Sequence, residues 1–336
     1  MDVGLLMLGD PGRSREITRR AESAGFAHLA FGDTQNLGPE AWGQLLLAAA
    51  ASSRIRLGTG VTNPVTRDAA LTASAALALQ LESGGRAFCG IGRGDSALAK
   101  IGREPERVDD FERYVADLRA YLAGEMVKRG GAASRIEWIP AGLPRVPVEV
   151  AASGPRVLEL AARVADGVVF CLGADPEVLA RALEAFRAAA RRAGRDPAAL
   201  RAGAFVNCAV ADDVAEARAL ARGGASVFAR FAAWSGDGAL QSAATRAAAR
   251  AIDRGYEMAR HAQAAGGGAR SLDDAFLDAF AIVGTPEHAA ARLRRLASIG
   301  LDFVTVAPGS SDMGWEDGWR SIERIGREVI PALARA

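Results

Sequence analysis

Eight short apolar runs, separated by longer helical segments, constrain the fold more than any other feature of the sequence. Near-continuous apolar runs of this length are typical of parallel strands that are buried on both faces. Their alternation with helices predicts an α/β protein folded as a (β/α)8 TIM barrel. The runs are Val3 to Leu8, His28 to Gly32, Ile55 to Val61, Ala87 to Ile91, Val146 to Ala151, Gly167 to Cys171, Gly203 to Val210 and Phe303 to Ala307.

A doubly wound open sheet is the alternative to the barrel, and the glycine-rich stretch "GIGRGDS" at residues 90–96 discriminates between them. A dinucleotide-binding sheet carries G-x-G-x-x-G after its first strand, where the glycines let the backbone approach a pyrophosphate. Here the stretch follows the fourth run and lacks the third glycine at the required spacing. We therefore favour the barrel, in which this stretch is the turn after the fourth strand.

Two segments are longer than the usual connections between strands and helices. Residues 124–145 form an excursion after the fourth helix, and residues 222–280, which are largely helical, lie between the seventh and eighth strands. Insertions in a barrel usually decorate the C-terminal face, where lids and pockets are built. We expect residues 1–336 to form a single domain with a helical insertion at about 222–280.

Charge and composition argue against several classes of protein. The 41 Lys and Arg residues balance 40 Asp and Glu residues, and a net charge of +1 gives no reason to expect a nucleic-acid or membrane partner. The three cysteines lie far apart and the three histidines show no i, i+4 pairing, so we expect no disulfide framework and no metal site. The N-terminus lacks the pattern of a signal peptide, so we expect a cytoplasmic protein. The partner that we expect is a small-molecule substrate.

The residues that follow the predicted strands are rich in glycine, aspartate, serine and asparagine. In a barrel these residues share one mouth, so they indicate a polar surface that a large ligand can approach closely. The alternative is that such loops are always rich in turn residues. Two of these stretches indicate a specific kind of ligand. Ser153-Gly154-Pro155 begins an amphipathic helix whose N-terminus suits a phosphate. In the other stretch, the Arg93 guanidinium can donate two parallel hydrogen bonds to an anion.

Three blocks of sequence resemble a known family. They are "GTGVTNPVTRDAALTASAALALQLESGGRAFCGIGRGDSALAKIG", "VAASGPRVLELAARVADGVV" and "DDAFLDAFAIVGTPEHAAARL". The chain resembles the luciferase-like flavin and deazaflavin oxidoreductases, and within them the coenzyme F420-dependent methylenetetrahydromethanopterin reductases. The resemblance implies a barrel that binds FMN or coenzyme F420 at its C-terminal mouth, in a protein that is commonly a homodimer.

The resemblance also implies which residues form the site. It predicts a nonprolyl cis peptide between Gly60 and Val61, behind the cofactor ring, with Asp33 and Thr34 as the candidate catalytic residues. Asp33 has a second interpretation as a helix cap or Asx turn. The residues expected to bind the cofactor are Gly60, Val61, Thr62, Asn63, Arg93, Gly94, Asp95, Ala152, Ser153, Gly154, Pro155 and Gly173.

The sequence departs from the reductase pattern at three positions. Leu6 stands where the reductases have a glutamate, Thr34 where they have a histidine, and Arg93 where they have a proline. The loss of ionisable groups argues against the reductases' own substrate, and the charge of Arg93 would suit a different cofactor phosphate, for instance that of FMN.

The function we expect is therefore that of an FMN- or F420-dependent oxidoreductase, acting on a small organic substrate by hydride transfer or by oxygen activation. A noncatalytic flavin- or F420-binding accessory protein is the alternative. We interpret His261, on the insertion, as a solvated helix position in preference to a substrate contact.

Overall fold

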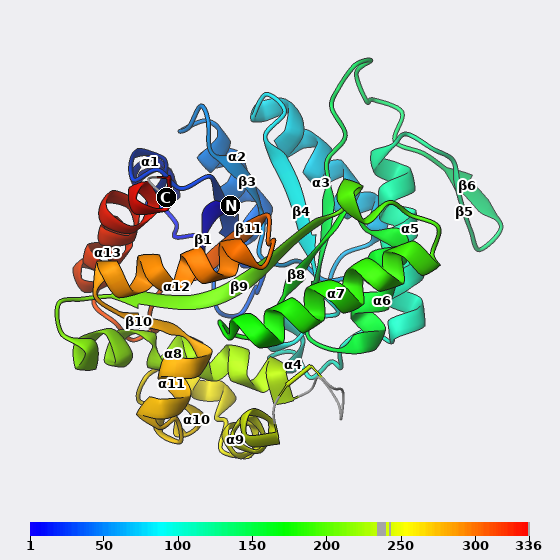
Figure 1. The fold of residues 1–336 in the computed structure, drawn as a ribbon. Coiled ribbons are helices and arrows are strands. Elements are labelled where there is room, and N and C mark those ends of the chain that lie inside the picture. The colour runs from blue at the N-terminus through cyan, green and yellow to red at the C-terminus, as the bar shows by residue number, and fades with distance from the viewer. Residues whose placement is uncertain (234–239, 242, 335–336) are drawn as a thin grey trace.

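Eight parallel strands form a closed barrel in the computed structural model, which describes residues 1–233, 240–241 and 243–334 (Figure 1). Each strand pairs with the next, and pairing of the last strand with the first closes the circle. All eight predicted strands are present, so the predicted TIM barrel is confirmed. In spatial order they are β1 (Asp2–Met7), β2 (His28–Phe31), β3 (Arg56–Thr59), β4 (Ala87–Ile91), β7 (Val148–Ala152), β8 (Gly167–Phe170), β9 (Arg201–Val210) and β11 (Phe303–Ala307).

Helices surround the barrel and connect its strands. Their amphipathic faces bury alanine and leucine against the sheet, while arginines cover much of the outer surface. The helices outside the insertion are α1 (Ser14–Ser23), α2 (Ala41–Ala49), α3 (Ala69–Glu82), α4 (Ser96–Ala99), α5 (Val108–Leu122), α6 (Pro155–Val164), α7 (Pro176–Arg192), α12 (Pro286–Ser298), α13 (Trp315–Arg324) and α14 (Ile330–Ala334).

Glycines on β1 and β9 make room for rings that fill the barrel interior. A Cβ on Gly4 would lie 2.0 Å from the His28 Nε2 atom, and a Cβ on Gly203 would lie 2.4 Å from the Phe303 ring. The His28 ring contacts Phe303 and Phe88 edge to face, with centroids 5.5 and 5.8 Å apart. These rings lie near the N-terminal ends of their strands, so they close the barrel at the end opposite to its mouth.

The segment predicted as an insertion is helical. Helix α8 (Val214–Ala233) follows β9 and continues without a break across residue 222, where the insertion was expected to start. Three further helices, α9 (Ala243–Arg254), α10 (Gly267–Arg270) and α11 (Asp274–Phe280), complete it. Figure 1 shows α8 to α11 gathered at one end of the barrel.

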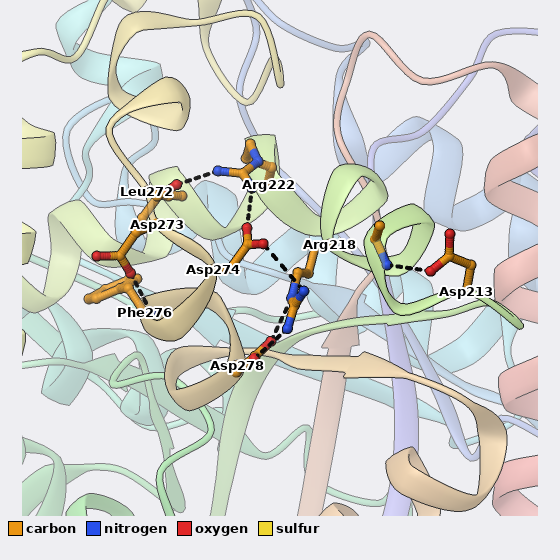
Figure 2. Close-up of polar contacts among 9 residues, drawn as sticks. Asp213, Arg218, Arg222, Leu272, Asp273, Asp274, Phe276 and Asp278 are labelled. Carbon is orange, nitrogen blue, oxygen red and sulfur yellow. Dashed lines mark hydrogen bonds and ion pairs between the residues drawn. The ribbon is translucent and has the colours of Figure 1, made fainter.

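Ion pairs fasten the end of the insertion to α8 (Figure 2). The Arg218 guanidinium lies 2.6 Å from Asp278 and 3.3 Å from Asp274, and Arg222 lies 2.8 Å from Asp274. Arg222 also donates to the Leu272 carbonyl. Helix α11 is thereby held against α8, so the insertion packs onto the barrel as a structured cover.

Two small elements were not foreseen. Strand β10 (Ile282–Gly284) pairs with the C-terminal end of β9, outside the eight strands of the closed barrel. Residues 124–145, expected only as an excursion, contain a hairpin of β5 (Val127–Arg129) and β6 (Ala132–Ser134). Among the helices that the structure describes, none combines the length and apolar character needed to cross a bilayer.

Candidate functional site

A cavity of about 1200 Å³ opens at the C-terminal ends of the strands. Apolar side chains form much of its lining and a small number of polar groups face it, an arrangement typical of small-molecule and cofactor sites. The insertion supplies one wall through α8. The floor and that wall include Leu6, Val61, Ala151, Cys171, Phe205, Val227, Phe228 and Phe231.

The peptide bond between Gly60 and Val61 is cis, as predicted. It follows β3, and both residues line the cavity. A Cβ on Gly60 would lie 2.6 Å from the Leu6 Cδ1 atom, so the leucine that replaces the expected glutamate packs directly beside the cis bond. Leu6 therefore contributes apolar surface to the floor and brings no proton to it.

Asp33 provides an acid at the edge of this floor. Its Oδ2 atom accepts a hydrogen bond of 2.6 Å from the hydroxyl of Thr62, which is fully buried. Burial raises the pKa of the Asp33 carboxyl, and the bond from Thr62 opposes that shift in part. The neighbouring Thr34 hydroxyl is buried without a hydrogen-bond partner in the described part of the chain, so it is available to a ligand.

Asp95 lines the cavity and also contacts the insertion. Its Oδ2 atom lies 3.5 Å from the Arg230 guanidinium of α8, which lies 3.1 Å from Asp253 and stacks over the Tyr256 ring at 4.1 Å. Burial raises the pKa of Asp95 to about 6, although the charge of Arg230 favours the ionised form. Asp95 thus joins the turn after β4 to the cover above it.

Two arginines and a helix N-terminus provide positive potential on the β4 and β7 side of the cavity. Arg93 and Arg156 both line the cavity, and Arg93 is held by a 2.5 Å bond from Nε to the Glu106 carbonyl. Burial and the nearby charge of Arg156 lower the pKa of Arg93. Gly154 caps α6 without a side-chain hydrogen bond, so backbone N–H groups of its first turn remain open to an anion.

The structure gathers most of the predicted site residues around one cavity. The exceptions are Ala152 and Gly173, neither of which lines it. Gly173 has φ +80°, and a Cβ there would lie 2.6 Å from the Phe280 ring, so packing and backbone conformation account for this glycine. The residues that do line the cavity are Asp33, Thr34, Gly60, Val61, Thr62, Asn63, Arg93, Gly94, Asp95, Ser153, Gly154 and Pro155.

Asn63 has a structural role within this group. Its Oδ1 atom accepts hydrogen bonds from the Val65 and Thr66 backbone N–H groups, at 3.1 and 3.0 Å, and from the Thr66 hydroxyl. These bonds form an Asx turn that fixes the loop after the cis bond. The amide oxygen is therefore occupied by the loop itself.

Sequence reasoning missed Asn207. This residue of β9 is 1 % exposed and lines the cavity, and both of its amide atoms lack a hydrogen-bond partner in the described part of the chain. Helix α8 crosses it at Gly224, where a Cβ would lie 3.0 Å from the Asn207 Nδ2 atom. An asparagine inside the otherwise apolar run at residues 203–210 was the available signal.

The interpretation of His261 as a solvated helix position is wrong. His261 follows the last turn of the insertion's short 3-10 helix at Met258–Arg260 and lines the cavity. Within the described ranges, no three His, Cys, Asp or Glu side chains gather as metal ligands would. The expectation of no metal remains a prediction.

The sequence of the chain is similar to a protein family and to several individual proteins. Residues 4–302 match the family model of the luciferase-like monooxygenases. The 5,10-methylenetetrahydromethanopterin reductase of Methanolobus tindarius is 35% identical over 319 residues, which cover 92% of this chain and 93% of the relative. The reductase of the same name from Archaeoglobus fulgidus is 32% identical over 318 residues, covering 93% of each.

A solved structure has the same fold. The structure of the coenzyme F420 dependent tetrahydromethanopterin reductase from Methanopyrus kandleri superposes with a TM-score of 0.77, at 24% identity and over 99% of both chains.

Removal of the Asn207 amide should cost little stability. We expect Asn207→Ala to change the free energy of unfolding by less than about 0.5 kcal/mol, because the buried amide makes no compensating hydrogen bond. The matched variant Asn63→Ala should lower the free energy of unfolding by about 1–3 kcal/mol, because it leaves two backbone N–H groups without their acceptor. Urea denaturation of both ligand-free variants measures this. Equal losses would show that the Asn207 amide has a partner.

Asp95 should make stability depend on pH. Its folded pKa of about 6 exceeds the value of about 4 for an unfolded aspartate, so its contribution to the free energy of unfolding falls as pH rises between these values. Asparagine does not titrate. The stability of Asp95→Asn relative to the unmodified protein should therefore rise over this interval, measured by urea denaturation at several pH values. A difference that stays constant with pH would contradict the raised pKa.

Proposed function

The chain belongs to the luciferase-like monooxygenase family of flavin-type oxidoreductases, and we propose that its cofactor is coenzyme F420 and its reaction hydride transfer. Two relatives above 30% identity, each matched over more than nine tenths of its length, are named as reductases. The solved reductase that shares the fold is named as F420 dependent. Among FMN and F420, these similarities favour F420.

The cavity fits such a cofactor, and one observation carries the proposal. An apolar floor lies between a buried acid, Asp33, and an anion site formed by Arg93, Arg156 and the start of α6. A planar ring with an anionic tail needs both environments in one cavity. Gly94, with φ +97°, gives the turn after β4 a conformation that favours glycine, and a Cβ there would lie 2.3 Å from the Leu98 Cδ1 atom.

Different residues of this chain would hold the ring and the tail of the cofactor. Val61 and Leu6 support the ring, and Arg93 with the first turn of α6 holds the tail. Asp33 places a carboxyl group close to the ring floor, and the hydrogen bond that it accepts from Thr62 orients it. When bound, F420 supplies or accepts a hydride, and the cover formed by α8 excludes water.

The substrate that we propose is a small, uncharged organic carbonyl compound or its alcohol. The wall above the floor is built of Val227, Phe228 and Phe231, which suits an apolar body. Leu6 and Thr34 remove two ionisable groups that the resemblance associates with the reductases' own substrate. The noncatalytic alternative has less support, because the cavity retains Asp33 as an acid.

We also propose a homodimer formed through α2 and α3. These helices pack side by side, and α3 carries no charged residue before Glu82. Leu46, Leu71 and Leu81 are 36%, 54% and 40% exposed, although leucines on a solvated helix face are normally replaced by polar residues. A second copy of the chain would bury this face. We further propose that residues 1–336 act as one domain, located in the cytoplasm.

Cofactor titration tests the proposed function. We expect F420 to bind more tightly than FMN, followed by absorbance or fluorescence, and the loaded protein to reduce ketones or oxidise secondary alcohols without consuming oxygen. Tighter binding of FMN, or oxygen consumption during turnover, would contradict the proposal.

Arg93→Ala should weaken F420 binding about tenfold or more, because a charge-assisted hydrogen bond contributes about 1.5–3 kcal/mol. Arg103→Ala, on the same connection but exposed and away from the cavity, serves as the control. Unchanged affinity of Arg93→Ala would remove Arg93 from the anion site.

Leu71→Lys should convert the dimer into a monomer, because the charge would lie within the apolar face of α3. Size-exclusion chromatography with light scattering measures the molar mass. Met126→Lys, at an exposed methionine outside α2 and α3, should remain dimeric. A monomeric parent protein, or a dimeric Leu71→Lys variant, would refute this interface.

A further inference from the structure

His261 lies where the insertion meets the loop after β11, at the edge of the cavity. The Ser311 hydroxyl donates to the His261 carbonyl, and the Ser311 N–H donates to the Ala262 carbonyl at 2.8 Å. The next residues of the insertion, Ala264 and Ala265, donate their N–H groups to the Asp312 carboxylate. These bonds fix the backbone of His261 against the barrel, so its ring is held at a defined place in the cavity wall.

The ring of His261 is oriented by Tyr256. The Tyr256 hydroxyl lies 2.7 Å from the His261 Nδ1 atom, and it also accepts a hydrogen bond from the Ala262 N–H at 3.4 Å. Since Ala262 supplies a proton to that oxygen, the hydroxyl's own proton is free to point at Nδ1. Nδ1 is then the acceptor, and the ring proton lies on Nε2.

The Nε2 atom is left for a ligand. His261 lines the cavity, and no hydrogen bond joins Nε2 to another residue of the described chain. The ring is also uncharged at neutral pH: burial, and then the charges of Arg230 and Lys100, lower the pKa of His261 to about 4. A neutral imidazole N–H is a hydrogen-bond donor that stays in one protonation state across the physiological range.

We propose that His261 is a catalytic residue whose Nε2–H donates a hydrogen bond to the carbonyl oxygen of the substrate. This inference rests on the proposed hydride transfer. The hydride would come from reduced F420, so that a C–H bond of the cofactor breaks and its electron pair forms a new C–H bond at the carbonyl carbon, while the electrons of the C=O π bond move to the oxygen. His261 stabilises the charge that develops there and keeps its own proton, and the oxygen is protonated by Asp33 or by water.

His261 brings an imidazole to a cavity in which Leu6 and Thr34 replace the ionisable residues expected from the resemblance. Leu6 and Thr34 leave the floor and the β2 side without the ionisable groups that the resemblance led us to expect. His261 comes from the opposite wall, next to α8, where a Cβ on Gly223 would lie 2.2 Å from the Ala262 carbonyl oxygen. The insertion thus supplies an imidazole donor to the wall formed with α8.

The tautomer can be tested without the cofactor. The chain has three histidines, so ¹⁵N-histidine labelling gives three imidazole spin systems, and the signal lost in His261→Gln identifies His261. In the ligand-free protein at neutral pH we expect the proton on Nε2. In Tyr256→Phe we expect a mixture of both tautomers, because Nδ1 has lost its donor. A proton on Nδ1, or on both nitrogens, in the unmodified protein would overturn the proposal, whatever the cofactor proves to be.

Binding and turnover test the role of the donor. Acetophenone, a neutral ketone with an apolar body, should shift the Nε2 resonance of the F420-loaded protein, and an unshifted resonance would overturn the proposal. His261→Phe should lower kcat/KM for acetophenone about 10²-fold or more, the usual effect of deleting one such donor. His261→Gln, which retains an N–H, should recover part of that loss.

His288→Gln, at an exposed histidine of α12, should match the parent enzyme. A His261→Phe variant that binds F420 and retains full turnover would show that His261 is not catalytic. Failure of the parent protein to bind F420 would instead refute the proposed function, since the tautomer measurement does not depend on it.

Discussion

The hydrogen bonds that join β1 to β11 and β8 to β9 leave the eight-stranded circle without an edge, so the C-terminal ends of its strands meet at one mouth. Residues from distant parts of the sequence, such as Asp33, Asp95 and Asn207, come together only because the circle is complete. The rings of His28, Phe88 and Phe303 support it from within, and glycines on neighbouring strands give them space.

The mouth combines buried polar and acidic side chains, which are costly to bury, with apolar side chains, which favour burial. Its floor is apolar, yet Thr34 and Asn207 carry buried polar atoms without partners in the described chain, and the pKa of Asp33 and of Asp95 is raised. Each of these features costs stability in the absence of a ligand. Their concentration around one cavity is therefore more consistent with a binding site than with a structural core.

The fold was largely predictable because its signal is local. All eight apolar runs became strands, and β4 and β11 match their predicted limits. The cis bond at Gly60-Val61 was predicted through resemblance alone, since nothing in composition or periodicity indicates it. Strand β10 was missed because three apolar residues next to a helix give no periodic pattern. The start of the insertion stays a prediction, because α8 runs through residue 222 as one continuous helix and no local pattern marks a boundary there.

The candidate site was predictable only in part. The strand-end residues were found because the barrel dictates where they meet, whereas the environment of His261 depends on Tyr256, Ser311 and Asp312, contacts that no local pattern encodes. Arg93 was found as a departure from a family pattern, but its neighbour Arg156 was not.

The aromatic plug at the N-terminal end of the barrel has a kinetic consequence. Because His28, Phe88 and Phe303 fill the interior at that end, molecules that reach the floor must arrive and leave through the mouth. Two ligands that share one entrance cannot exchange independently when one of them lies deeper. The deeper ligand is expected to bind first and to leave last, so the order of encounter is determined by the architecture of the barrel.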